Sequence, residues 1–217
     1  MSKNTLVLAA MIGLSAAPAL AQGKFEASAF YGWAIVGGAP LPAQTTINGA
    51  SYTQADPRNG GTLGFTFGAY AESGLGLEFL WSRQATTLDV TGTGPALSGD
   101  MNIYSYHGQV VYQFGEPEQR AHLFLLGGLG ATRYSDVVLT AGDVTGRTRF
   151  SWAFGGGFKF YPSRRIGVKG MLRFVPTFVE AWESGFWCEP FTPSCSANSG
   201  APNSDQIEFS VGLVIRF

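Results

Sequence analysis

The feature that most constrains this chain is an alternation of apolar with small or polar side chains, which recurs in segments of about ten residues. It is clearest at the end of the sequence, where apolar side chains occupy every odd position from Ile207 to Phe217. Successive side chains of a strand face opposite sides, so this pattern predicts a strand with one apolar face. A soluble sandwich rarely sustains such alternation over the roughly eleven residues that a tilted strand needs to cross a bilayer. The segment therefore predicts a transmembrane β-strand.

The same alternation recurs upstream and predicts a set of similar strands. The predicted strands are residues 24–34, 62–71, 75–83, 104–114, 121–134, 150–160, 166–174 and 207–217. Short polar links, at 71–74, 115–120 and 161–165, alternate with longer Gly-, Thr-, Asn- and Pro-rich links, at 35–61, 86–101, 135–147 and 183–204. Membrane barrels have short turns at one end and long loops at the other, with an even strand count. We therefore predict an all-β fold, an eight-stranded antiparallel up-and-down transmembrane β-barrel.

Composition and one N-terminal segment separate this fold from a helical membrane protein. Only 13% of the residues are charged and 45% are hydrophobic, whereas soluble domains average about 25% charged residues. The apolar stretch 6–17 is shorter than the roughly 20 residues of a spanning helix. It follows Lys3 and precedes Ala19-Leu20-Ala21, as in a cleavable signal peptide. We predict a signal peptide at 1–21 and a barrel domain at 22–217; an N-terminal anchor helix is the alternative.

These features together carry a resemblance to a known family. The signal ending Ala19-Leu20-Ala21, the eight-segment layout and the closing segment from Val211 to Phe217 resemble the OmpA/OmpX-like outer-membrane β-barrel superfamily. The resemblance implies that Phe217 is the terminal aromatic recognised by the outer-membrane assembly machinery. It implies localisation in the bacterial outer membrane and contact with lipid and lipopolysaccharide. Eight strands with short periplasmic turns put both termini in the periplasm, and because the sequence stops at the end of the eighth predicted strand, we expect no soluble peptidoglycan-binding domain. The superfamily hosts adhesins, anchors, small porins and lipid-modifying enzymes, so the resemblance does not fix activity.

The predicted inward positions carry charges of both signs. They are Glu26, Glu78, Lys159, Lys169, Arg173, Glu208 and Arg216. An eight-stranded barrel is just wide enough for its interior to be filled by side chains, so a plug of paired charges is expected. An ion pathway or gate is the alternative. Because the first and last strands pair on closure, Glu26 and Arg216 should lie at similar depth and form one of the pairs.

The fourth long link is the candidate contact loop. Its aromatic residues are Phe186, Trp187 and Phe191, and Trp182 immediately precedes it. Cys188 and Cys195 lie in the same link, and in an exported protein such a pair predicts a local disulfide. A metal site is the alternative, although no His or third Cys is near in sequence. A preorganised, exposed aromatic loop is a candidate surface for a host, surface or envelope ligand; protection against proteolysis is the other interpretation.

Other classes of function find less support. Net charge is −1, or −2 without Lys3, so no basic face indicates nucleic-acid binding. A lipid-modifying enzyme would need a His with a nearby Ser and an acid. His107 has Ser105 on the same predicted face but points into the narrow interior, and His122 adjoins a short turn. We therefore expect a monomeric, non-enzymatic barrel without metal or cofactor, whose loops carry a structural or surface-interaction role. The alternative is a small-solute channel.

Overall fold

The computed structural model describes residues 24–37, 39–47, 50–116, 119–139, 142–178 and 203–217, and within them every regular element is a strand. The strands are β1 (Lys24–Val36), β2 (Ala39–Ile47), β3 (Ala50–Pro57), β4 (Gly60–Tyr70), β5 (Leu75–Gly92), β6 (Leu97–Phe114), β7 (Ala121–Tyr134), β8 (Val137–Leu139), β9 (Gly142–Val144), β10 (Thr148–Phe160), β11 (Ile166–Phe178) and β12 (Asn203–Arg216). No helix in this described part of the chain is long and apolar enough to span a membrane.

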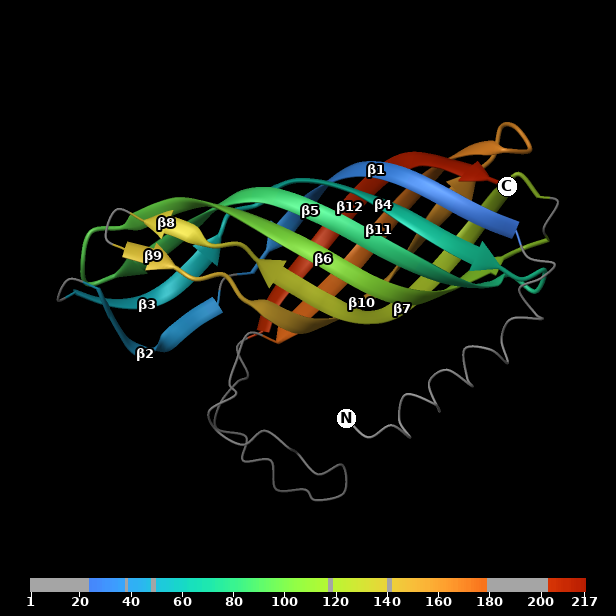
Figure 1. Cartoon of the computed structure of the whole chain (residues 1–217). Coiled ribbons are helices and arrows are strands. Elements are labelled where there is room, and N and C mark those ends of the chain that lie inside the picture. The colour runs from blue at the N-terminus through green and yellow to red at the C-terminus, as the bar shows by residue number, and fades with distance from the viewer. Residues whose placement is uncertain (1–23, 38, 48–49, 117–118, 140–141, 179–202) are drawn as a thin grey trace, which may run out of the picture.

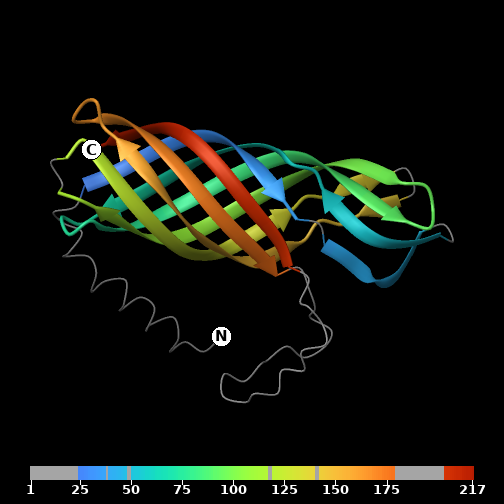
Figure 2. The same ribbon diagram turned by 180° about the vertical axis from the view of Figure 1, so that it is seen from behind.

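Eight of these strands close into an antiparallel barrel, as predicted (Figures 1 and 2). Their order is β1, β4, β5, β6, β7, β10, β11 and β12, and β12 returns to pair with β1. Following paired residues once around the wall leads from Lys24 back to Ala34, ten residues further along the same strand. This stagger tilts the strands, and eight tilted strands leave an interior that side chains can fill.

The two faces of the wall differ as the alternation predicts. On β4, buried and more exposed residues alternate along the whole strand. Large apolar side chains cover the outside, where Leu123 is 66% exposed and Phe209 51% exposed. The inside holds buried polar and charged side chains together with an apolar layer. That layer consists of Phe30, Tyr70, Leu80, Val111, Phe124, Leu126 and Met171.

One end of the barrel is formed by tight turns and is called the short-turn end below. In the 71–74 turn, Gly74 has φ +83° and its amide donates to the Ala71 carbonyl at 3.0 Å. A side chain is strained at this φ, which explains the glycine. Gly115 begins the next turn with φ +101°. Both chain ends of the described barrel, Lys24 and Phe217, lie at this end (Figure 1).

The opposite, extended end differs from the sequence prediction of loops. The predicted link 86–101 is mostly a continuation of β5 and β6, whose pairing extends to Val90 opposite Leu97. The predicted link 35–61 contains the β2–β3 hairpin, with β3 added to the edge of β5, and the link 135–147 contains the β8–β9 hairpin. Gly, Thr and Pro in these segments indicated loops, but paired backbone overrides such local preference. β5 and β6 therefore project well beyond the ends of β10, β11 and β12 at this end (Figure 1).

The projecting wall encloses an apolar cluster of its own. Leu88 and Val90 of β5 point inward, against inward residues of β6 and β8. Its buried members are Val36, Tyr52, Leu88, Val90, Leu97, Met101, Ile103, Val137 and Leu139. Tyr52 also donates a hydrogen bond from its hydroxyl to the Pro95 carbonyl at 3.1 Å. Burial of these side chains gives the extension a folded core, separate from the polar interior of the barrel.

Candidate functional site: the barrel interior

The first ion-pair network lies near the short-turn end and centres on Glu26. Its Oε1 lies 2.9 Å from Arg216 Nη2, and its Oε2 lies 2.5 Å from Lys159 Nζ. Tyr161 donates its hydroxyl to the same carboxylate at 2.8 Å. The register of β1 and β12 sets Glu26 directly opposite Arg216. The structure thus brings together the pair expected from strand closure and adds Lys159 from the far wall.

The second network centres on Glu78, which is joined to the first. Lys169 Nζ lies 2.8 Å from Glu78 Oε2, and the Tyr70 hydroxyl donates to the same oxygen at 2.8 Å. Gln109 Nε2 donates to Glu78 Oε1 at 3.2 Å. Lys159 Nζ donates to the Tyr70 hydroxyl at 3.0 Å. Tyr70 therefore bridges two ion pairs across the interior.

A third ion pair lies further inside the barrel. Arg173 Nη2 is 3.0 Å from Glu208 Oε2, and both side chains are fully buried. Ser82 accepts a further bond from the same guanidinium at 3.3 Å. Among the described atoms, Arg173 Nε, Arg173 Nη1 and Glu208 Oε1 have no hydrogen-bond partner. Such buried polar atoms are commonly satisfied by internal water.

All seven charges expected inside the barrel are therefore held in ion pairs. Three carboxylates meet four cations, with Glu26 serving both Lys159 and Arg216. An unpaired charge in this apolar surrounding would carry a large desolvation penalty. Tyr70 and Tyr161 were not among the predicted inward residues, although Tyr70 continues the inward set of β4. Their rings also pack on cations, with Lys159 Nζ 4.1 Å from the Tyr70 ring centre and the Arg216 guanidinium 4.0 Å from the Tyr161 ring centre.

The two histidines lie on the inner face of the wall, and His107 is buried there as expected. His107 Nε2 is 3.0 Å from Ser151 Oγ of β10. Ser151 also accepts a bond from Thr132 at 3.0 Å, and His107 is fully buried. Neither ring nitrogen of His122 has a hydrogen-bond partner among the described residues. In the described chain, no three His, Cys, Asp or Glu residues are grouped so as to hold a metal ion.

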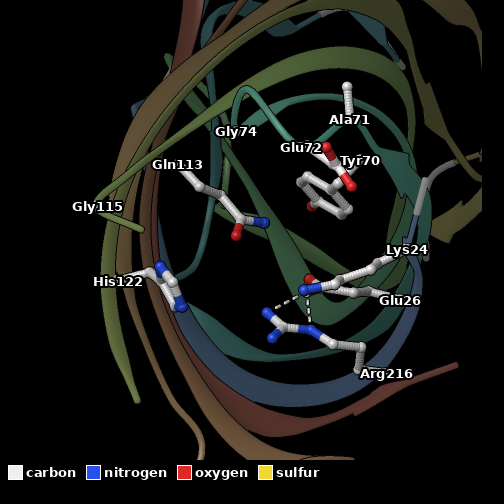
Figure 3. A pocket seen from close by; sticks show the side chains of 10 residues that line it. All are labelled: Lys24, Glu26, Tyr70, Ala71, Glu72, Gly74, Gln113, Gly115, His122 and Arg216. Carbon is white, nitrogen blue, oxygen red and sulfur yellow. Dashed lines mark hydrogen bonds and ion pairs between the residues drawn. The ribbon is translucent and has the colours of Figure 1, made fainter. Parts of the chain in front are cut away.

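A small hollow opens at the short-turn end of the interior (Figure 3). Its volume is about 30 Å³, which suits one or two water molecules rather than a larger ligand. Glu26 and Arg216 form one side and His122 and Gln113 the other (Figure 3). The hollow therefore ends on the first ion-pair network, which lies between it and the rest of the interior.

Comparison with known proteins identifies the kind of barrel. The model for the outer membrane protein beta-barrel domain matches residues 6–217. The chain belongs to this family. The outward apolar wall is therefore the lipid-facing surface of a bacterial outer-membrane protein, and the resemblance found in the sequence is confirmed. A search of curated proteins finds no match.

Solved outer-membrane barrels share this fold at low sequence identity. Neisserial surface protein A (NspA) is 14% identical, with TM-score 0.57 over 90% of this chain and 100% of that one. OprG from Pseudomonas aeruginosa is 15% identical, with TM-score 0.54 over 90% and 96%. Ail, the attachment invasion locus protein of Yersinia pestis, solved with the heparin analogue sucrose octasulfate, is 15% identical, with TM-score 0.51 over 90% and 99%. At these identities the likeness concerns the fold alone.

The remaining predictions concern Phe217 and two segments outside the described residues. Phe217 is 72% exposed, and its amide donates to the Phe25 carbonyl at 2.8 Å; recognition by the assembly machinery stays a prediction. The predicted signal peptide, 1–21, lies outside the described residues. So does the predicted contact loop with its cysteines, namely Trp182, Phe186, Trp187, Cys188, Phe191 and Cys195.

Proposed function

We propose that this protein is a closed, non-catalytic outer-membrane barrel that presents its extended end outside the cell as an interaction surface. The observation that carries the proposal is that two barriers of different chemistry fill the inside. Ion pairs joined by Tyr70 occupy the barrel interior, and the apolar cluster of β1, β3, β5, β6 and β8 occupies the extension. An ion passing through would have to break buried pairs and then cross an apolar layer, and both steps are unfavourable.

The proposed orientation rests on the asymmetry of the two ends. Barrels of this class have short turns in the periplasm and long connections outside the cell. The 71–74 turn and the described chain ends lie at one end, whereas the hairpins β2–β3 and β8–β9 lie at the other. The extended end would thus face outward, and loops on a rigid scaffold are where binding functions concentrate.

A small-solute channel is the second candidate, and one observation favours it. Polar atoms without partners among the described residues remain inside the barrel, on His107, Gln109, Arg173 and Glu208. Water bound to these atoms would hydrate part of the interior. A closed barrel should give no reproducible open conductance level in planar lipid bilayers, whereas a steady unitary conductance would favour the channel.

The burial of His107 supports the proposed non-catalytic role. His107 and Ser151 form a His–Ser pair, but both are fully buried in the wall, so a lipid in the outer leaflet could not reach them. His107→Ala should therefore leave the lipid composition of the outer membrane unchanged.

The interaction role is tested on cells that display the protein. Protease added to intact cells should cleave the extended end and spare the short turns. Attachment to a surface coated with sulfated polysaccharide is a suitable first assay, because the similar Ail structure holds a heparin analogue. Cells with the 183–204 link shortened should attach less than cells with wild-type protein. Equal attachment of the two kinds of cells to sulfated polysaccharide and to other host surfaces would contradict the proposal. Cleavage at the short turns on intact cells would contradict it as well.

A further inference from the structure

A row of outward-facing residues marks where the apolar band ends on neighbouring strands. The outward apolar series on β5 and β7 gives way at Arg83 and Arg133, and on β10 at Thr148, and all three residues are exposed. Backbone pairing sets Arg83 opposite Tyr104 and Tyr104 opposite Arg133. The two arginines are thus two strand spacings apart, about 10 Å, with an aromatic ring between them.

The two guanidinium groups retain donors for an anion. Arg83 Nε donates to Asn102 Oδ1 at 3.0 Å, and the guanidinium lies 6.0 Å from the Tyr104 ring centre. Within the described residues neither Arg83 nor Arg133 forms an ion pair, whereas Arg58 and the four interior cations each have a carboxylate partner. Guanidinium groups at a membrane surface are well suited to bidentate binding of phosphate.

Below this row the lipid-facing wall contains a hollow of about 750 Å³. A Cβ added at Gly108 or Gly127 would meet no heavy atom within 4 Å, so these glycines leave the space open. The surrounding large side chains are Phe67, Leu77, Phe79, Val110, Leu129, Trp152 and Phe154. Gly108 follows Tyr104 by four residues on β6, about 13 Å along the strand, which is within the length of an acyl chain.

We propose that Arg83, Arg133 and this hollow form one binding site for a phosphorylated, acylated lipid of the outer leaflet, of the lipid A class. The phosphate would lie on the two arginines, and an acyl chain would occupy the hollow over Gly108 and Gly127. Either feature alone would accept many molecules, but their spacing selects a ligand that carries both groups. The inference rests on the proposed orientation, which puts the arginine row in the outer leaflet.

The site is tested by native mass spectrometry of the detergent-solubilised full barrel titrated with purified lipid A. Wild-type protein should retain lipid A, and dephosphorylated lipid A about ten-fold less well, because charge-assisted bonds to phosphate are lost. Arg83→Gln/Arg133→Gln should show the same loss with intact lipid A. The matched control is Arg164→Gln/Arg165→Gln, which removes two exposed arginines at the short-turn end and should bind like wild type.

The hollow is tested separately by filling it. Gly127→Leu should lower lipid A retention while both arginines remain, and Gly108→Ala serves as a milder substitution if the leucine variant folds poorly; heat-modifiable migration reports folding. Equal retention by wild type and the double arginine variant would overturn the proposal. So would unchanged retention in the folded glycine variants, or full displacement of lipid A by inorganic phosphate. Orientation is measured independently by protease cleavage on cells, so failure of the proposed function would be recognised apart from failure of this site.

Discussion

Replacing Glu26 by Gln keeps the shape of the side chain but removes the charge that holds two cations. Glu26 is 3% exposed and Lys159 1% exposed, so the change leaves the Lys159 ammonium buried with no carboxylate of its own network. Removing one partner of such a pair costs roughly 3–5 kcal/mol. Lys159→Met should cost less, about 1.5–3 kcal/mol, because Glu26 keeps its bonds from Tyr161 and Arg216.

The double variant Glu26→Gln/Lys159→Met removes both buried charges and leaves Arg216, whose side chain is 14% exposed and reaches the mouth of the barrel. Its destabilisation should therefore fall short of the sum of the single variants by about 2 kcal/mol or more. Urea unfolding in lipid vesicles, followed by tryptophan fluorescence, gives the three free energies. The control pairs Glu26→Gln with Arg173→Met, which belongs to the separate Glu208 pair and should be additive. Additivity within about 0.5 kcal/mol in the first cycle would refute the reasoning.

Three further predictions concern the C-terminal residue, the two cysteines of the fourth long link and an ion pair of the extension. Deleting Phe217 should leave export intact but reduce the heat-modifiable folded band, and a normal folded yield would show that this residue is not a recognition element. Replacing Cys188 and Cys195 by Ser should leave barrel stability nearly unchanged while the loop becomes more protease-sensitive; finding free thiols in the native protein by mass spectrometry would remove the basis for this expectation. The Arg58 guanidinium, 2.6 Å from Asp89, holds the pKa of that carboxyl below its ordinary value of 3.8. The small stabilising effect of this ion pair is fully present above the ordinary pKa and is lost as the pH falls through the lowered pKa of the folded protein. Arg58→Gln should therefore raise the midpoint of the Asp89 titration measured by NMR, and an unchanged midpoint would contradict the pairing.

Alternation predicted the barrel well because every wall residue must face one of two different environments. On β12, Phe209 and Leu213 face lipid while Glu208 is fully buried inside, so the two-residue period is written directly into the sequence. A shift of one residue would place each charge in hydrocarbon, which makes the register strongly determined. The charge positions followed from the same rule, and so did the opposition of Glu26 and Arg216 once the first and last strands were paired.

The extended end could not be predicted in this way. Residues 86–101 contain Thr, Gly and Pro, which locally favour turns, yet most of this segment continues the β5–β6 hairpin. Its stability depends on the apolar cluster that Leu88 forms with Met101, Ile103 and Val137, and these four side chains come from three strands, β5, β6 and β8. Such long-range contacts outweigh local preference and leave only a weak periodic signal in each segment.

The sequence by itself determined a closed barrel in lipid, its strand count and the set of charges that face inward. The tertiary structure decided which charges meet, because partners across the interior depend on the ten-residue stagger of the closed wall. That stagger brings Lys159 to Glu26 from the opposite side and places Tyr70 between two ion pairs. The register of β5, β6 and β7 aligns Arg83 with Arg133 above two open glycines on neighbouring strands. No local pattern contains this information, since contacts between distant strands are fixed only when the sheet closes.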